Sequence, residues 1–230
     1  MNWFLQAPLC KSCLIETRFA NLNSKIKLWH ATFQSSYISQ LSPVMEMTIK
    51  QANLQYASNK RKAEFIAGRQ LMMQAFDTDL PFKKLKSGAP QIPAGYNASL
   101  SHSRNNIALL LGSDQFFYGV DIEFILSTLA FQAVLSRRST KKEFIWLCKL
   151  PVGQQLAAAT LLFSAKETLY KLLYDKIELN NFYKRLSLES ISRNGFIRFK
   201  QTTPKYTVDN LVVQYKWLKD SILTWAIFPR

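Results

Sequence analysis

The stretch Ile107-Ala-Leu-Leu-Leu-Gly-Ser-Asp-Gln-Phe-Phe-Tyr-Gly-Val-Asp-Ile-Glu123 lies near the middle of the 230-residue chain. Apolar and aromatic residues dominate 107–111 and 116–122, and the turn-forming residues 112–115 separate them, so the pattern predicts two strands joined as a hairpin. The sequence on either side divides into two parts of similar size that meet near Ser113. We therefore predict an N-terminal half over residues 1–113 and a C-terminal half over residues 114–230.

Helix and strand patterns surround this stretch on both sides. Residues 43–76 carry apolar side chains at spacings of three and four, which predicts two helical segments broken near Ser58-Asn59. Residues 1–40 predict short strands and loops, and the Pro and Gly residues of 81–96 predict a loop. The patterns predict helices over residues 127–150 and 154–173. They predict antiparallel strands over residues 186–191, 196–201, 211–218 and 222–226. The expected fold class is α+β.

The charge balance indicates an acidic partner. Thirty Lys and Arg residues against fifteen Asp and Glu residues give a net charge of +15, and such a surface attracts polyanions. Charge alone does not separate a nucleic acid, a nucleotide cofactor, an acidic protein and an anionic membrane. A content of 48% apolar residues with only seven Gly and eight Pro excludes a disordered chain.

The cysteines and the hydropathy pattern favour a cytoplasmic protein. Cys10 and Cys13 form a single Cys-x-x-Cys without a second pair, and Cys148 stands alone, so ordinary thiols are favoured over a redox or metal role. A secretory signal and a run of 18 apolar residues are both missing from the sequence. A peripheral membrane contact through the basic surface stays open.

The first motif with chemical meaning is Gly119-Val-Asp-Ile-Glu123 at the end of the second predicted strand. The period of two in a strand places Asp121 and Glu123 on one face. Two neighbouring carboxylates repel each other, unless a hard cation binds between them or one is protonated. The competing interpretation is a solvated strand end with two exposed acids.

The second motif is Phe163-Ser-Ala-Lys-Glu-Thr-Leu-Tyr-Lys171. Glu167 and Lys171 lie four residues apart and therefore share one face of the predicted helix. Taken alone, this spacing is equally typical of an ordinary surface ion pair, which stabilises a helix by about 0.3–0.5 kcal/mol.

Two further motifs offer donors for phosphate. Residues 99–103 surround His102 with hydroxyl side chains, and hydroxyls, backbone N–H groups and imidazole all donate to phosphate oxygens. A Ser-His nucleophile pair and a packed loop histidine are the alternatives. The basic helix start at 60–62, followed by Arg69, either holds a phosphate or is a solvated helix end.

In order and spacing these four motifs resemble the phosphopantetheinyl transferases of the surfactin-synthetase type, most closely the enterobactin-synthase branch. The resemblance covers residues 61–69, the loop 88–95, and residues 99–103, 119–123 and 163–171. It implies two similar α/β halves in a pseudo-twofold arrangement, with a cofactor cleft between them that holds coenzyme A. Phe163 stands where many relatives carry Trp, and residues 1–40 offer no comparable motif.

The resemblance also implies a role for individual side chains. It assigns Mg²⁺ to Asp121, Glu123 and Glu167, whose carboxylate oxygens suit this cation. Glu167, directly or through a water, is the expected base, and Lys171 is the expected catalytic cation. The residues expected to bind coenzyme A are Arg61, Lys62, Arg69, Pro90, Ser101, His102, Asp121 and Lys171.

The implied activity is transfer of the 4'-phosphopantetheine group of coenzyme A to a serine of an apo carrier protein. The carrier is a peptidyl, aryl or acyl carrier domain, and siderophore or other nonribosomal peptide synthesis is the expected setting. A chain that contains both halves is expected to work as a monomer. Residues 124–160 are the candidate docking region for an acidic carrier, with an ordinary amphipathic helix as the alternative. A basic nucleic-acid-binding protein is the alternative function, although no nucleic acid is expected as a partner.

Overall fold

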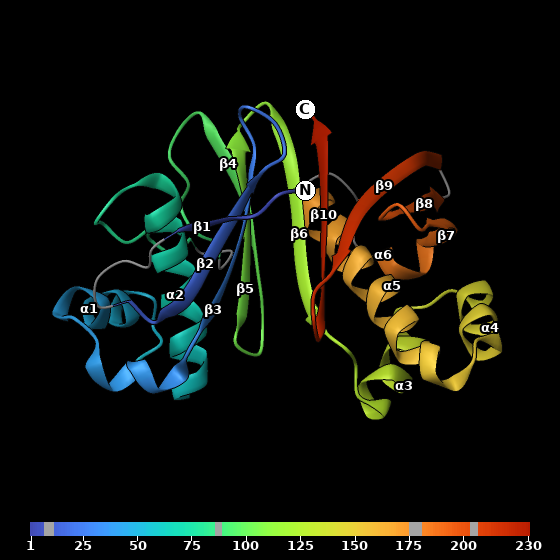
Figure 1. The fold of residues 1–230 in the computed structure, drawn as a ribbon, viewed down its shortest axis with the longest axis horizontal. Helices are drawn as coiled ribbons and strands as arrows, with labels where there is room; N and C mark the ends of the chain where they lie inside the picture. Colours follow the sequence, from blue (N-terminus) through green and yellow to red (C-terminus); the bar gives the residue numbers. More distant parts are fainter. Residues whose placement is uncertain (7–11, 86–88, 175–180, 203–206) are drawn as a thin grey trace. The chain divides into compact units, whose positions relative to one another are not determined.

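Two five-stranded sheets, each with its own helices, make up the computed structural model (Figure 1). The structure describes residues 1–6, 12–85, 89–174, 181–202 and 207–230. The chain divides into two units, residues 1–116 and 117–230. The fold is therefore α+β with two similar halves, as predicted.

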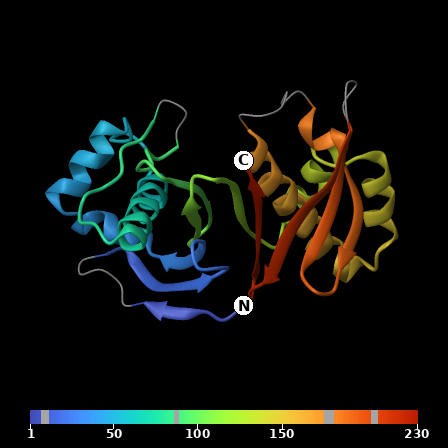
Figure 2. The ribbon, with the colours of Figure 1, turned by 90° about the horizontal axis from the view of Figure 1, so that it is seen from above.

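The N-terminal unit is built around helix α2 (Asn59–Phe76). Ser58 caps this helix by accepting a hydrogen bond from the Arg61 backbone N–H at 3.3 Å, which explains why the predicted break falls at Ser58-Asn59. Figure 2 shows α2 beside the strands of its own sheet, whose order is β1-β2-β3-β5-β4. The other elements of this unit are β1 (Phe4–Gln6), β2 (Leu14–Asn21), β3 (Lys27–Phe33), the 3-10 helix η1 (Ser35–Gln40), α1 (Pro43–Gln51), β4 (Tyr96–Ser103) and β5 (Asn106–Ser113).

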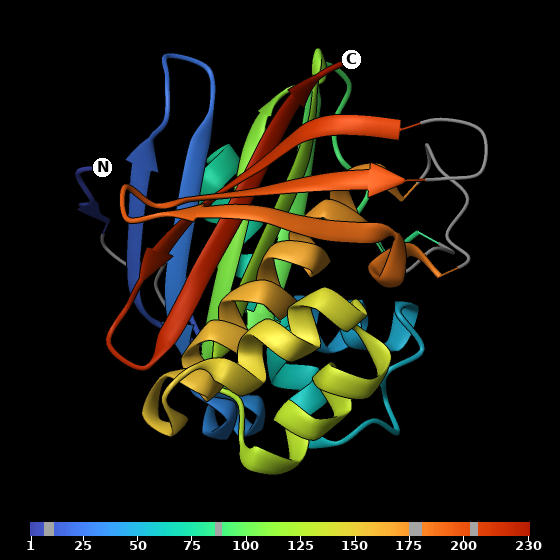
Figure 3. The same ribbon diagram turned by 90° about the vertical axis from the view of Figure 1, so that its right-hand side faces the viewer.

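The C-terminal unit is built around α5 (Val152–Leu173), which packs against the sheet of order β6-β10-β9-β8-β7. Figure 3 shows α3 and α4 gathered beside α5. The long helix and the four late strands agree with the sequence prediction. The elements are β6 (Phe116–Phe124), α3 (Thr128–Arg137), α4 (Lys141–Lys149), α6 (Phe182–Arg185), β7 (Leu186–Ser192), β8 (Phe196–Thr202), β9 (Thr207–Trp217) and β10 (Ser221–Pro229).

The predicted hairpin of residues 107–122 is wrong, although both of its strands exist. Strand β5 pairs with β3 on one edge and with β4 on the other, whereas β6 pairs with β10. Both edges of β5 are thus occupied, and a strand has only two edges to pair. The short connection between β5 and β6 therefore carries the chain from one sheet to the other.

The two described cysteines, Cys13 and Cys148, are free thiols. Cys13 is buried, and burial raises the pKa of its thiol to about 12, which makes a reactive thiolate at neutral pH unfavourable. Its Sγ lies 2.8 Å from the Gln70 side-chain oxygen. Cys10, the other half of the predicted pair, lies outside the described residues. Among the described residues, no helix is long and apolar enough to cross a membrane.

His30 gives the N-terminal sheet a testable pH dependence. Its Nε2 donates to the Asn106 side-chain oxygen at 2.7 Å, and burial lowers the pKa of His30 below its ordinary 6.5. The folded protein binds a proton at His30 less readily than the unfolded chain, whose histidine titrates near the ordinary 6.5, so stability should fall as the pH falls below this value.

Urea unfolding at pH 7.5 and pH 5.5 should therefore show a smaller loss of unfolding free energy in His30→Gln than in the wild type. Equal losses in the wild type and His30→Gln would show that His30 does not carry this pH dependence.

Candidate functional site

Strand β6 and helix α5 approach each other at Gly119 more closely than a side chain allows. A Cβ atom built on Gly119 would lie 2.1 Å from the Thr168 carbonyl oxygen and 3.0 Å from the Leu172 Cβ. Only glycine permits backbone contact this close. The contact brings the next residues of β6 directly against the side chains of α5.

Asp121 is the centre of the polar contacts that follow. It is 3% exposed; Lys171 Nζ donates to its Oδ1 at 2.7 Å, and Ser164 Oγ donates to its Oδ2 at 2.8 Å. Lys171 Nζ also donates to the Val120 carbonyl oxygen at 3.0 Å. Both carboxylate oxygens are thus fixed by groups from α5, as a buried carboxylate requires.

Three hydroxyl groups, two from α5 and one from β10, form a connected network beside the Asp121 carboxylate. Ser164 Oγ lies 2.9 Å from Thr224 Oγ1, and Thr168 Oγ1 lies 2.6 Å from the same atom. All three side chains are fully buried. The network therefore fixes the orientation of Ser164, and through it that of Asp121.

Glu167 lies on α5 between these residues in sequence, and its surroundings raise the pKa of its carboxyl group. Burial is the main cause that raises the pKa of Glu167, and the Asp121 charge raises it further. The Tyr183 hydroxyl, Lys171 and Arg138 act in the opposite direction. Two predicted site residues, Glu167 and Lys171, therefore interact with the same Asp121.

The predicted metal ligands do not form a ready-built site. No three His, Cys, Asp or Glu side chains among the described residues gather into a group that could hold a metal ion, so Asp121, Glu123 and Glu167 are not assembled as such a group. The chemistry of the donors nevertheless fits a hard divalent cation. Carboxylate oxygens are the ligands that Mg²⁺ prefers, and the mutual repulsion of Asp121 and Glu167 is what a cation would relieve.

The N-terminal unit holds a second polar cluster, which joins α2 to β4. Arg61 Nη1 lies 3.1 Å from His102 Nε2 and 3.4 Å from Glu64 Oε2. Glu64 Oε2 also lies 3.7 Å from His102 Nδ1. The Arg61 side chain is 49% exposed, so its guanidinium can reach a phosphate in solution. The structure thus brings together Arg61 and His102, two of the predicted phosphate contacts.

The remaining predicted cofactor residues lie in different surroundings. Arg69 is only 2% exposed, its guanidinium lies 4.4 Å from the centre of the Phe65 ring, and its Nε and Nη2 have no hydrogen-bond partner among the described residues. Burial lowers the pKa of Arg69 to about 10. Arg69 therefore differs from the exposed Arg61, although the two were predicted together.

Lys62, Pro90 and Ser101 stay predictions as cofactor contacts. Lys62 is half-buried on the first turn of α2, and Pro90 forms an isolated bridge with Lys84 in the predicted loop. Ser101 is buried in β4, where alternation turns it to the face opposite His102. Lys84, the bridge partner of Pro90, lines a cavity of about 280 Å³. The other residues that line this cavity are Thr48, Gln51, Ala52, Phe65, Pro81, Phe82 and Lys83.

Sequence reasoning missed several residues of both clusters. Glu64 was signalled by its position three residues after Arg61, and Ser164 by its position three residues before Glu167, because such pairs share a helix face. Tyr183 and Thr224 carried no local signal, since they reach the site only through the tertiary fold.

The two units match two family models separately. The 4'-phosphopantetheinyl transferase N-terminal domain matches residues 50–111, which include the Arg61–His102 cluster. The 4'-phosphopantetheinyl transferase superfamily matches residues 118–221, which include Asp121, Glu167 and Lys171. The chain belongs to the 4'-phosphopantetheinyl transferase superfamily, as its motifs predicted.

The chain is also similar in sequence to a curated protein. The chain is 31% identical over 138 residues to enterobactin synthase component D of Salmonella austin. The match covers 56% of this chain and 55% of that protein, so the chain spans about half the length of this relative.

The close contact at Gly119 predicts a sharp loss of stability on adding one methyl group. In Gly119→Ala the new Cβ would overlap the Thr168 carbonyl oxygen, which is backbone and has little freedom to move. We expect the unfolding free energy to fall by about 2–3 kcal/mol, as for overpacked cores. Gly153→Ala on α5 meets no atom within 4 Å and should leave urea unfolding near that of the wild type. Wild-type stability of Gly119→Ala would contradict the contact.

Proposed function

We propose that the protein transfers the 4'-phosphopantetheine group of coenzyme A to a serine of an apo carrier protein and releases 3',5'-ADP. The observation that supports this most is the Asp121–Lys171 pair beside Glu167, within the segment that matches the transferase superfamily. The named relative favours siderophore or other nonribosomal peptide synthesis as the setting. The comparisons give no support to the nucleic-acid alternative.

The proposed reaction is a phosphoryl transfer from one oxygen to another. The serine Oγ attacks the β-phosphorus of coenzyme A, a new O–P bond forms, and the bond from that phosphorus to the bridging oxygen of 3',5'-ADP breaks. The serine proton leaves to a base, and negative charge grows on the released phosphate. Such a reaction depends mainly on positioning and on stabilisation of charge.

Glu167 is the proposed base, acting directly or through a water. Burial raises the pKa of Glu167, and a carboxylate with a raised pKa accepts a proton more readily than an ordinary one. Hydroxyl groups of Ser164 and Thr168 line the same helix, but they are fully buried and are occupied in holding Asp121 and Thr224.

Positively charged and hydrogen-bond-donating side chains are proposed to bind the phosphates of coenzyme A. The Lys171 ammonium is fixed by Asp121 and by the Val120 carbonyl, so its charge is oriented before a substrate binds. Arg61 and His102 are the proposed contacts of the N-terminal unit. Lys62, Arg69, Pro90 and Ser101 are retained as proposed cofactor contacts from the sequence.

Mg²⁺ is the proposed metal, and Asp121, Glu123 and Glu167 are its proposed ligands. When bound, such a cation neutralises the charge that grows on the leaving phosphate. We place the reaction in the cytoplasm and assign it to a monomer, as expected from the sequence.

The exposed face of α4 is the proposed docking surface for an acidic carrier protein. Phe144 and Ile145 are exposed there beside Lys141 and Lys142, and the net charge of +15 would steer an acidic partner toward the chain. Phe131, which lies within the predicted docking region of residues 124–160, is instead buried in the core of the C-terminal unit.

The proposed activity predicts a defined mass change in a carrier protein. Incubation of the protein with coenzyme A, Mg²⁺ and an apo peptidyl, aryl or acyl carrier should add one phosphopantetheine group, which intact-mass spectrometry detects. Glu167→Gln should lower the transfer rate about 10²–10⁴-fold, the usual contribution of a general base.

The matched control for this substitution is Glu189→Gln, because Glu189 is exposed on β7 and its loss should leave the rate near that of the wild type. No mass change with any of the three carriers would overturn the proposed function. Wild-type transfer by Glu167→Gln would overturn only the role of Glu167.

The docking surface predicts a selective loss of carrier binding. The double variant Lys141→Glu and Lys142→Glu should raise KM for the carrier about tenfold at low salt, with KM for coenzyme A unchanged, and the difference should shrink as ionic strength rises. Lys25→Glu with Lys219→Glu makes the same change in net charge at two other exposed positions. Equal effects of the two double variants would place carrier docking elsewhere.

A further inference from the structure

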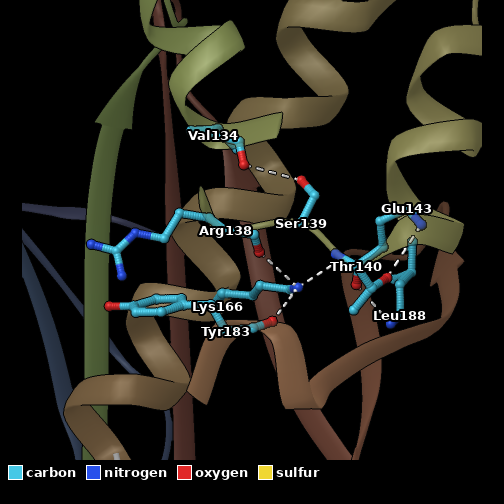
Figure 4. A network of polar contacts seen from close by, with 8 residues as sticks. All are labelled: Val134, Arg138, Ser139, Thr140, Glu143, Lys166, Tyr183 and Leu188. Atoms are coloured by element: carbon cyan, nitrogen blue, oxygen red, sulfur yellow. Dashed lines mark hydrogen bonds and ion pairs between the residues drawn. The ribbon is translucent and has the colours of Figure 1, made fainter. Parts of the chain in front are cut away.

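A fully buried lysine lies directly beside Glu167 in the sequence. Lys166 is 0% exposed, and its Nζ donates to Glu143 Oε2 at 2.7 Å, to the Tyr183 carbonyl oxygen at 2.8 Å and to the Arg138 carbonyl oxygen at 3.0 Å (Figure 4). These three acceptors use all three N–H donors of an ammonium group. Lys166 therefore joins α5 to the residue after α3, to α4 and to α6.

Glu143 extends this connection to a further element. Its Oε2 also accepts from the Thr140 backbone N–H at 2.7 Å, and its Oε1 accepts from the Leu188 backbone N–H at 2.9 Å. The Thr140 hydroxyl in turn accepts from the Glu143 backbone N–H at 3.3 Å, which completes a capping box at the start of α4. The buried ion pair thus fixes backbone atoms of α4, α6 and β7 around one point.

The two residues anchored through their carbonyl groups also meet through their side chains. The Arg138 guanidinium carbon lies 3.8 Å from the centre of the Tyr183 ring, within the range of a cation–π contact. The Tyr170 ring stacks against the same ring at 5.5 Å between centres and 16° between planes. Figure 4 shows the Arg138 and Tyr183 side chains together on one side of the network.

The hydroxyl group of Tyr183 interacts with Glu167. The two side chains form a hydrogen bond, in which the phenol O–H donates and the carboxylate oxygen accepts. The ring of Tyr183 is held by Arg138 and Tyr170, and its backbone by Lys166. The phenol is therefore a donor in a fixed position.

From this geometry we propose that Tyr183 is a positioning residue for Glu167, and that the buried Lys166–Glu143 pair fixes the place of Tyr183. This inference rests on the proposed function of Glu167. Lys166 does not touch the substrate in this arrangement, because its ammonium is fully enclosed by protein acceptors. A partner that orients a catalytic carboxylate acts through that carboxylate.

The first test removes the phenol oxygen alone. Tyr183→Phe keeps the ring between Arg138 and Tyr170 and should lower kcat for transfer about 10–100-fold, the usual effect of losing a partner that orients a site residue. KM for coenzyme A should stay within about twofold, because Tyr183 is not proposed to bind it. Tyr215→Phe is the matched control: it removes a hydroxyl that donates to the Ser192 carbonyl oxygen at 2.8 Å on the same unit, and it should leave kcat near that of the wild type. A kcat for Tyr183→Phe within twofold of the wild type would overturn the proposal.

The second test asks whether Lys166 acts through Tyr183. Lys166→Met combined with Glu143→Gln removes both charges together, because removing one partner would leave the other buried and unpaired. This pair variant should lower kcat at least tenfold, and adding Tyr183→Phe should lower it by less than a further twofold. If the factors by which the pair variant and Tyr183→Phe lower kcat multiply in full, the two changes act independently. That result would overturn the link from Lys166 to Tyr183. Circular dichroism shows whether each variant folds, and if the pair variant does not, Tyr183→Phe still decides the role of Tyr183.

A third measurement does not depend on turnover. Binding of Mn²⁺ alone, followed by electron paramagnetic resonance, should weaken about tenfold in Tyr183→Phe and stay unchanged in Tyr215→Phe; equal affinity in both variants would contradict the positioning role. The Glu167→Gln variant separates this proposal from the one on which it rests. If Glu167→Gln transfers at the wild-type rate, the role of Glu167 is wrong; if Glu167→Gln is impaired and Tyr183→Phe is not, only the positioning role is wrong.

Discussion

The contact between the backbones of β6 and α5 at Gly119 is the constraint on which the C-terminal site depends. A side chain there would overlap the Thr168 carbonyl oxygen, so the absence of a Cβ atom sets how close the strand lies to the helix. At this separation the side chain of Asp121 reaches Ser164 and Lys171 with hydrogen bonds shorter than 3 Å. A wider separation would leave a buried carboxylate without partners, which is costly.

Two ion pairs on α5 illustrate two uses of buried charge. The Lys166–Glu143 pair is enclosed on all sides, and both partners are saturated by backbone groups. Enclosed pairs of this kind are poor sources of stability compared with apolar residues of similar size, so their value lies in the geometry they fix. The Lys171 side chain, by contrast, is 29% exposed, and a partly exposed ammonium on a buried carboxylate is suited to meet a phosphate.

The sequence predicted those parts of the fold that local patterns determine. The break before α2 follows from the capping side chain of Ser58, and the length of α5 follows from its apolar period. The pairing of β5 and β6 could not be predicted in this way, because it depends on β3 and β10, which are distant in sequence. The motifs indicated Asp121, Glu167 and Lys171, whereas Tyr183 enters the site only through contacts made after folding. Nor could the motifs distinguish the exposed Arg61 from the buried Arg69, since charge does not reveal burial.

The helical period explains why neighbouring residues of the Lys-Glu motif belong to different parts of the structure. Consecutive residues of an α-helix are turned by about 100°. Ser164, Thr168 and Lys171 form one stripe of α5 that faces β6 and β10, whereas Lys166 points away from that stripe toward α4 and α6. Glu167 lies between these two directions on the helix, and it interacts with both Asp121 and Tyr183. Residues 164–171 of α5 therefore carry both the side chains that pack the helix and the carboxylate of Glu167.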